Sequence, residues 1–145
     1  MVKKSESLDR GMLDGLVGYH LRRAQVAVFR DFAESVGQLG ITPGQFGVLE
    51  LIACNDGLNQ SALARALGVD RSTLVAVLDR LQADGLIERR ESATDRRSHA
   101  LGLTGQGRAK AEQARAAIAV HEARVLQGLS AAQIDELFAA LRAIG

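Results

Sequence analysis

The amino-acid sequence predicts a mainly α-helical fold with one small β-hairpin. Hydrophobic residues make up 47% of the 145 residues but aromatic residues only 3%, so the core is built largely from Leu, Ala and Val, which favours helices. Most apolar residues recur every three or four positions, as on the buried face of a helix. Residues 86–103 depart from this period and form two short segments around a polar turn.

Three helices are expected in the middle of the chain. Each begins after a residue that caps helix N-termini, and the first of these, Thr42, adds Pro43 and a capping-box Gln45. Each ends close to a glycine, which adopts the left-handed backbone of helix ends. The expected ranges are 43 to about 55 after Thr42, 60–67 after Asn59, and 71 to about 84 after Asp70.

Long helices are expected on both sides of this middle region. The first runs from about residue 9 to residue 36, the second from 105 to 127, and the last follows a capping box at Ser130. The helix over 105–127 carries a coiled-coil-like seam of Ala111, Ala114, Ile118, His121 and Val125. These apolar faces are too extensive for one small domain to cover, so we expect a homodimer with interleaved terminal helices. The alternative is packing within one chain.

The helix pair 60–67 and 71–84, joined by a tight glycine turn, suits a DNA reader. The second helix of such a pair lies in the major groove, and its first turn reaches the base edges. Here that turn and its neighbours offer a cation, two hydroxyls and two small apolar side chains: Arg71, Ser72, Thr73, Val75 and Ala76. An ordinary helical hairpin with a solvated face is the alternative.

The hairpin that follows, with strands at 86–91 and 98–103, supports DNA binding. Residues 89–97 hold four arginines against two acidic residues. A cationic tip beside a recognition helix enters the adjacent minor groove, where negative potential is concentrated. The net charge of the whole chain is only +1, so this local placement of arginine has to supply the attraction.

Residues 95–104 fit the D-x-R-x-x-x-x-x-L-T signature of the MarR family, the multiple antibiotic resistance regulators, which the whole chain resembles in length and helix order. The resemblance implies a winged helix-turn-helix with flanking dimerisation helices: one domain over 1–145, a DNA-binding lobe at 42–103, and dimerisation helices at 9–37 and 104–145. It implies a homodimer on a double-stranded DNA operator. The DNA contacts that it adds are Gln60 and Ser61 on phosphates, Arg97 in the minor groove, Asp95 holding Arg97, and the neighbouring Arg96.

Members of this family bind small aromatic effectors between the dimerisation helices and the DNA-binding lobe. The polar run 18–24 resembles the corresponding segment of the hydroxycinnamate-catabolism regulators, which respond to aromatic acyl-CoA thioesters. Arg22 and Arg23 would then pair with phosphates. The expected ligand residues are Tyr19, His20, Arg22, Arg23, Phe46 and Leu49. The alternative for His20 and Arg23 is an ion-pair cluster at the dimer interface, with Glu34 or the last helices.

Other classes of function fit the sequence less well. Oxidation of Cys54 is the competing mechanism of regulation. The family's peroxide sensors, however, carry their reactive cysteine in the first helix, and residues 16–20 of this chain contain none. We therefore interpret Cys54 as a small buried hydrophobe. Three histidines on separate elements, without a phosphate loop or a serine elbow, argue against an enzyme, a metal site or a cofactor. A helical adaptor that binds no DNA would not need the arginine-rich tip. No signal peptide or membrane span is apparent, which predicts a cytoplasmic protein.

Overall fold

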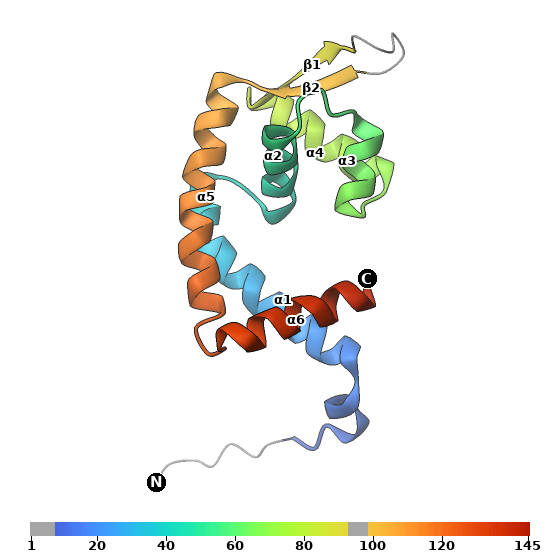
Figure 1. Cartoon of the computed structure of the whole chain (residues 1–145), viewed down its shortest axis with the longest axis vertical. Helices are drawn as coiled ribbons and strands as arrows, with labels where there is room; N and C mark the ends of the chain where they lie inside the picture. The colour runs from blue at the N-terminus through green and yellow to red at the C-terminus, as the bar shows by residue number, and fades with distance from the viewer. Residues whose placement is uncertain (1–7, 93–98) are drawn as a thin grey trace.

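The long helix α5 (Gly105–Val125) connects a lobe of short elements to the helices at the two ends of the chain (Figure 1). The computed structural model describes residues 8–92 and 99–145. The lobe contains α2 (Pro43–Cys54), α3 (Gln60–Leu67), α4 (Arg71–Ala83) and an antiparallel hairpin of β1 (Ile87–Glu91) and β2 (His99–Leu103). At the other end of α5, α6 (Ala131–Ile144) crosses α1 (Val17–Glu34) in this view. The predicted fold class is confirmed.

The expected capping residues begin the helices of the lobe. Thr42 and Gln45 form the capping box of α2, and the side chain of Asn59 accepts a hydrogen bond from the amide of Ala62 at the start of α3. Leucines from α2, α3 and α4 meet in a closed core under the hairpin. Its fully buried leucines are Leu49, Leu63, Leu74, Leu78 and Leu81. This packing holds α3 and α4 as a rigid helix-turn-helix.

The first expected helix is not continuous. A 3₁₀ turn, η1 (Gly11–Gly15), precedes α1, and Leu16 between them is extended, with φ −99° and ψ 122°. A second 3₁₀ turn, η2 (Val36–Leu39), follows α1. The amide of Gly11 is held by the carboxylate of Asp9 at 2.8 Å, and Gly11 has a positive φ of 52°. This local turn competes with the helix, so the prediction of one helix from residue 9 was wrong for its first two turns.

The seam on α5 packs inside its own chain. Ala111, Ala114 and His121 are buried, and α5 lies against α1, α2 and η2. The buried ring of Phe32 on α1 meets the His121 ring edge-to-face, with centroids 5.6 Å apart. Our use of this seam as support for a dimer was therefore wrong, because the chain itself supplies the partner surface.

A hydrogen-bonded ion cluster joins α1 to α5 at the end of the seam. Asp31 accepts from His121 Nδ1 at 2.6 Å and from Arg124 at 2.7 and 3.0 Å. The His121 side chain is buried. Hydrogen bonds from Arg124 and then His121 lower the pKa of Asp31 from 3.8 to about 2.

Asp31→Asn is expected to destabilise the protein in a pH-dependent manner. Because the folded state lowers the pKa of Asp31, its contribution to stability is complete above the unfolded value near 4 and is lost as the pH falls toward about 2. Thermal unfolding of both proteins at one concentration, from about pH 6 to about pH 3, would show the gap between their midpoints narrowing on the acid side. A gap that is constant over this range would contradict the proposed role of the carboxylate.

The start of α5 lies against the start of the hairpin. Thr104 donates its hydroxyl proton to the carbonyl of Gly85 at 2.6 Å and accepts from the amide of Gly107 at 3.0 Å. A Cβ atom at Gly107 would lie 1.9 Å from the carbonyl oxygen of Leu86. Only glycine permits this approach, which connects the long helix rigidly to the hairpin. Within the described ranges, no helix has the length and apolar character needed to cross a membrane.

Candidate DNA interface and ligand crevice

The exposed face of α4 carries the side chains predicted to read DNA. Leu74, Leu78 and Leu81 point into the core, which leaves the opposite face at the surface. Of the predicted DNA-contacting residues on α4, Arg71, Ser72, Thr73 and Ala76 are exposed, and Val75 is partly buried. Gly68, with a φ of 65°, turns the chain between α3 and α4. The two helices therefore have the arrangement that a major-groove reader requires.

Asp70 does more than the sequence predicted for an N-cap. Its carboxylate accepts from the amide of Thr73 at 2.7 Å, and also from the hydroxyls of Ser72 at 2.6 Å and Thr73 at 2.8 Å. These hydrogen bonds, with that from Ser72 the strongest, lower the pKa of Asp70 from 3.8 to about 2. An ionised carboxylate thus orients both hydroxyls at the N-terminal tip of α4.

The predicted phosphate contacts stand at the start of α3. Ser61 is exposed and Gln60 is partly buried in the first turn, after Asn59. Unpaired amides at a helix N-terminus favour anions, which suits the predicted phosphate contacts.

The base of the hairpin is attached to α4 by Arg89. Its guanidinium donates to Asp79 at 2.9 Å and to Gln82, and its side chain is 25% exposed. Arg90 pairs with Glu88 on the same strand. Two of the four arginines around the tip are therefore occupied with protein contacts. Asp95, Arg96 and Arg97 lie outside the described residues.

The predicted ligand residues of α1 lie on its N-terminal half. His20 Nε2 is 2.8 Å from the carbonyl oxygen of Asp14. Arg23 donates to the hydroxyl of Tyr19 at 3.4 Å, and its guanidinium lies 5.6 Å from the centre of that ring. Arg22 is exposed on the same half-helix. In the described chain Arg23 contacts no carboxylate, so the alternative ion-pair cluster would need a second subunit.

The other two expected ligand residues do not join this group. Leu49 is fully buried in the core of the lobe, and its contact with a ligand stays a prediction. Phe46 is partly buried and packs on the same core.

The structure instead shows an apolar cavity of about 320 Å³ between α1 and the turn that leads into α2. Its lining includes Phe29, Phe32 and Ala33 of α1, with Ile41 and Pro43 at the start of α2. Sequence reasoning missed Phe29, although it lies seven residues, or two helical turns, after Arg22.

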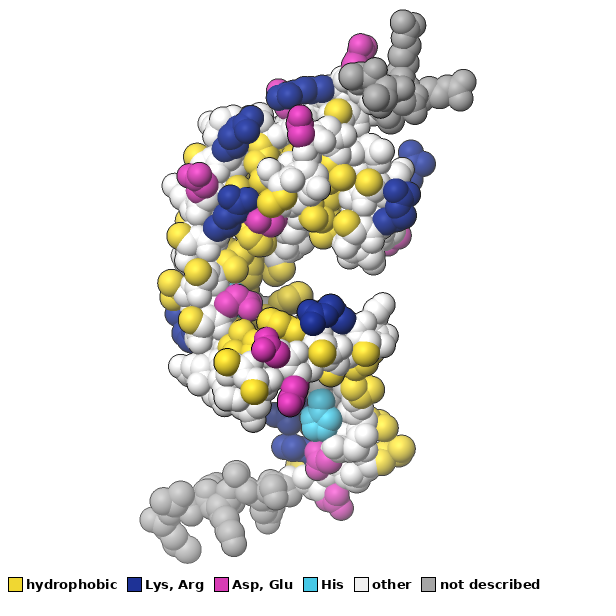
Figure 2. All heavy atoms as spheres, viewed as in Figure 1, with side chains coloured by type: hydrophobic (Ala, Val, Ile, Leu, Met, Phe, Trp, Pro, Cys, Tyr) yellow, Lys and Arg dark blue, Asp and Glu magenta, His cyan; other side chains and the backbone are white. Residues whose placement is uncertain are grey.

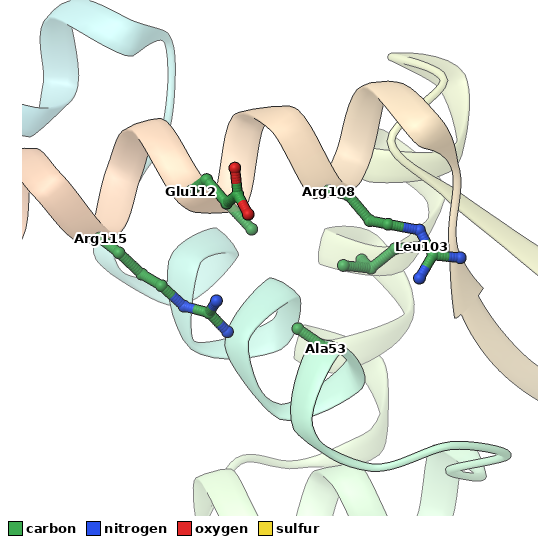
Figure 3. Close-up of a pocket in the computed structure, with 6 residues that line it drawn as sticks. Ala53, Leu103, Arg108, Glu112 and Arg115 are labelled. Atoms are coloured by element: carbon green, nitrogen blue, oxygen red, sulfur yellow. The ribbon is translucent and has the colours of Figure 1, made fainter.

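A second cavity, of about 190 Å³, lies between α2 and α5 (Figure 3). Arg115 extends from α5 toward α2, where it pairs with Glu50 at 2.8 Å and lies 3.9 Å from the sulfur of Cys54. Cys54 is exposed, so our interpretation of it as a buried hydrophobe was wrong. The cavity walls carry both charges, from Arg108, Glu112 and Arg115, and so do not select an anion or a cation.

Comparison with known proteins agrees with this geometry. The family model described as "MarR family" matches residues 39–98. A transcriptional regulatory protein for the hcr operon of Thauera aromatica is 50% identical over 101 residues, which span 69% of this chain and 61% of that protein.

Two solved structures of the transcriptional repressor CouR superimpose on nearly the whole chain. CouR bound to a 23-mer DNA duplex has a TM-score of 0.89 and 43% identity, over 95% of this chain and 98% of that one. CouR bound to p-coumaroyl-CoA has a TM-score of 0.87 and 42% identity, over 95% and 97%. The chain is thus a transcription regulator, not an enzyme, and it belongs to the MarR family.

Proposed function

We propose that this protein is a homodimeric repressor that an aromatic acyl-CoA thioester releases from its operator. The observation that carries the proposal is a continuous stripe on α1, which leads from arginine and tyrosine side chains to the aromatic cavity. The likeness to CouR, which has been solved with DNA and with p-coumaroyl-CoA, supports the same assignment. Such a regulator acts in the cytoplasm, where its DNA is.

The stripe consists of Tyr19, Arg22, Val26 and Phe29, spaced three, four and three residues apart. This spacing places the four side chains on one face of the helix, over about 15 Å. Val26 and Phe29 are 43% and 49% exposed, which is unusual for large apolar side chains without a partner. The stripe therefore offers an elongated ligand an apolar end and a cationic end.

The chemistry of an aromatic thioester matches the two ends. A cavity of about 150 Å³ holds a benzene molecule, so the 320 Å³ beside Phe29 and Phe32 accommodates a phenolic ring with its short acyl linker. The phosphates of coenzyme A would reach Arg22 and Arg23, with Tyr19 and His20 beside them.

The dimer would form through the terminal helices, at 9–37 and 104–145. In the described chain none of the side chains of α6 is buried, although one face of this helix is apolar. Apolar side chains gather at the surface over α6 and the N-terminal end of α1 (Figure 2). A two-fold axis through this surface would place two α4 helices in successive major grooves of a palindromic operator, about 34 Å apart.

The DNA contacts follow from the same arrangement. In the lobe at 42–103, α4 would lie in the major groove and α3 would hold phosphates through Gln60 and Ser61. The hairpin tip with Asp95, Arg96 and Arg97 would enter the minor groove. A ligand between the lobe and the dimerisation helices would change the distance between the two α4 helices and so release the DNA.

Fluorescence anisotropy on the DNA upstream of the protein's own gene tests this function. We expect tight binding that weakens steeply with salt, and p-coumaroyl-CoA should raise the Kd about ten-fold or more, whereas coenzyme A and p-coumarate should not. Tight binding that the thioester does not change would reject the ligand class. Loss of binding in peroxide that Cys54→Ser prevents would instead favour regulation by oxidation at the exposed Cys54 beside Arg115.

Arg22→Ala is expected to keep the DNA affinity of the parent but to need about ten-fold more thioester for release, because one charged phosphate contact is lost. Arg10→Ala is the matched control, since it removes the same charge from an exposed side chain that precedes α1 and lies outside the stripe. Equal thioester sensitivity of the two variants would show that the stripe is not the phosphate end of the site.

A further inference from the structure

Both hydroxyl groups at the N-terminal tip of α4, those of Ser72 and Thr73, donate their hydrogen atoms to the carboxylate of Asp70. Ser72 Oγ lies 2.6 Å from Asp70 Oδ1, and Thr73 Oγ1 lies 2.8 Å from Asp70 Oδ2. A carboxylate only accepts hydrogen bonds, so in both contacts the hydroxyl is the donor. The acid is ionised throughout the range in which proteins bind DNA, because these same contacts lower the pKa of Asp70 to about 2.

A hydroxyl has one proton and two lone pairs. With the proton directed to Asp70, the oxygens of Ser72 and Thr73 offer lone pairs alone to anything that approaches the exposed tip. In the major groove, adenine N6 and cytosine N4 are amino donors, whereas guanine O6 and N7 and thymine O4 are acceptors. An oxygen that only accepts therefore pairs with adenine or cytosine and repels the edges of guanine and thymine.

We propose that Asp70 is a positioning residue that sets the operator preference of α4, making Ser72 and Thr73 readers of amino-bearing bases. The inference rests on the proposed placement of α4 in the major groove. Arg71, a donor at the same tip, serves the complementary purpose, since its guanidinium pairs with guanine. The tip thus presents one hydrogen-bond donor, Arg71, and two acceptors, the hydroxyl oxygens of Ser72 and Thr73. The carboxylate of Asp70, which caps the helix, keeps these oxygens as acceptors.

Asp70→Asn separates this role from helix capping. Asparagine caps helices as well as aspartate does, so α4 keeps its start. The amide oxygen still accepts from the backbone of Thr73, but the amide nitrogen is a donor where the second carboxylate oxygen was an acceptor. One hydroxyl must then accept from Asn and turn its own proton outward, toward the DNA. The base preference at that contact is inverted from amino-bearing bases to guanine or thymine.

The experiment is selection of DNA from a library with randomised half-sites, followed by sequencing, for the parent and its variants. The parent should enrich adenine or cytosine at one or two positions in each half-site. In Asp70→Asn the enrichment of adenine or cytosine at one of these positions should fall about ten-fold, and guanine or thymine should replace them. This is the effect expected of one mismatched base contact. Thr73→Val, which removes the hydroxyl at constant size, should lose the preference at one position without gaining another.

Asp56→Asn is the matched control, because Asp56 is exposed in the α2–α3 loop and carries the same charge. It should select the parent's sequence, which separates base reading from general electrostatics. If Arg71→Ala changes the selected sequence while Asp70→Asn and Thr73→Val do not, the inference about Asp70 is overturned and the placement of α4 survives. If none of the three changes it, α4 does not read the bases, and the proposed placement itself fails.

Discussion

Phe138→Asp in α6 is expected to convert the protein into monomers and to weaken operator binding by about a hundred-fold or more, because one half-site alone would then be held. Phe138 is 40% exposed and lies on the apolar face of α6. Leu137, Leu141 and Ile144 complete that face and are 37%, 39% and 61% exposed. A carboxylate placed among such side chains in an interface would be buried without a partner, which is strongly unfavourable.

Sedimentation velocity at micromolar protein, together with the anisotropy assay, checks this result. Ala143→Asp is the matched control, since it adds the same charge to the opposite, exposed face of the same helix. The control should remain a dimer with the parent's affinity for DNA. A Phe138→Asp protein that is still dimeric would show that the subunits associate through another surface.

Gly107→Ala is expected to destabilise the fold by about 3 kcal/mol or more, the upper end for an overpacked site. The added Cβ would lie 1.9 Å from the carbonyl oxygen of Leu86, and that carbonyl belongs to the backbone and accepts from the amide of Thr104 at 3.1 Å. No rotation of a side chain relieves this overlap, so α5 and the hairpin have to move apart. DNA affinity should fall as well, because the hairpin is positioned by this contact.

Thermal unfolding at fixed protein concentration should show the Gly107→Ala midpoint lower by about 10 °C. Gly105→Ala, two residues earlier in the same helix, is the control: a Cβ there meets none of the described atoms within 4 Å. Because alanine favours helix over glycine by about 1 kcal/mol, this control should be unchanged or slightly more stable. Equal destabilisation by both substitutions would mean that loss of glycine at the helix start, and not the overlap with Leu86, is responsible.

The helix starts could be predicted because they depend on groups three residues apart in the sequence. Thr42, Asn59, Asp70 and Ser130 each accept from a backbone amide in the first turn, as their sequence context indicated. The exposed face of α4, which we propose reads DNA, followed from similar reasoning, since the buried period of Leu74, Leu78 and Leu81 leaves the other side chains at the surface. The second role of Asp70 did not follow, because rotamers decide which hydroxyls a cap reaches.

The sequence by itself determined the order and the limits of most elements, the helix-turn-helix, and the family. Only the tertiary structure decided which apolar faces the chain covers for itself. The seam of α5 is buried by α1, α2 and η2, whereas the apolar face of α6 stays exposed; Leu49 lies in the core, and Phe29 borders a cavity. Periodicity shows that a face is apolar, but what covers it depends on contacts between residues far apart in the chain, such as Asp31 with His121 and Arg124.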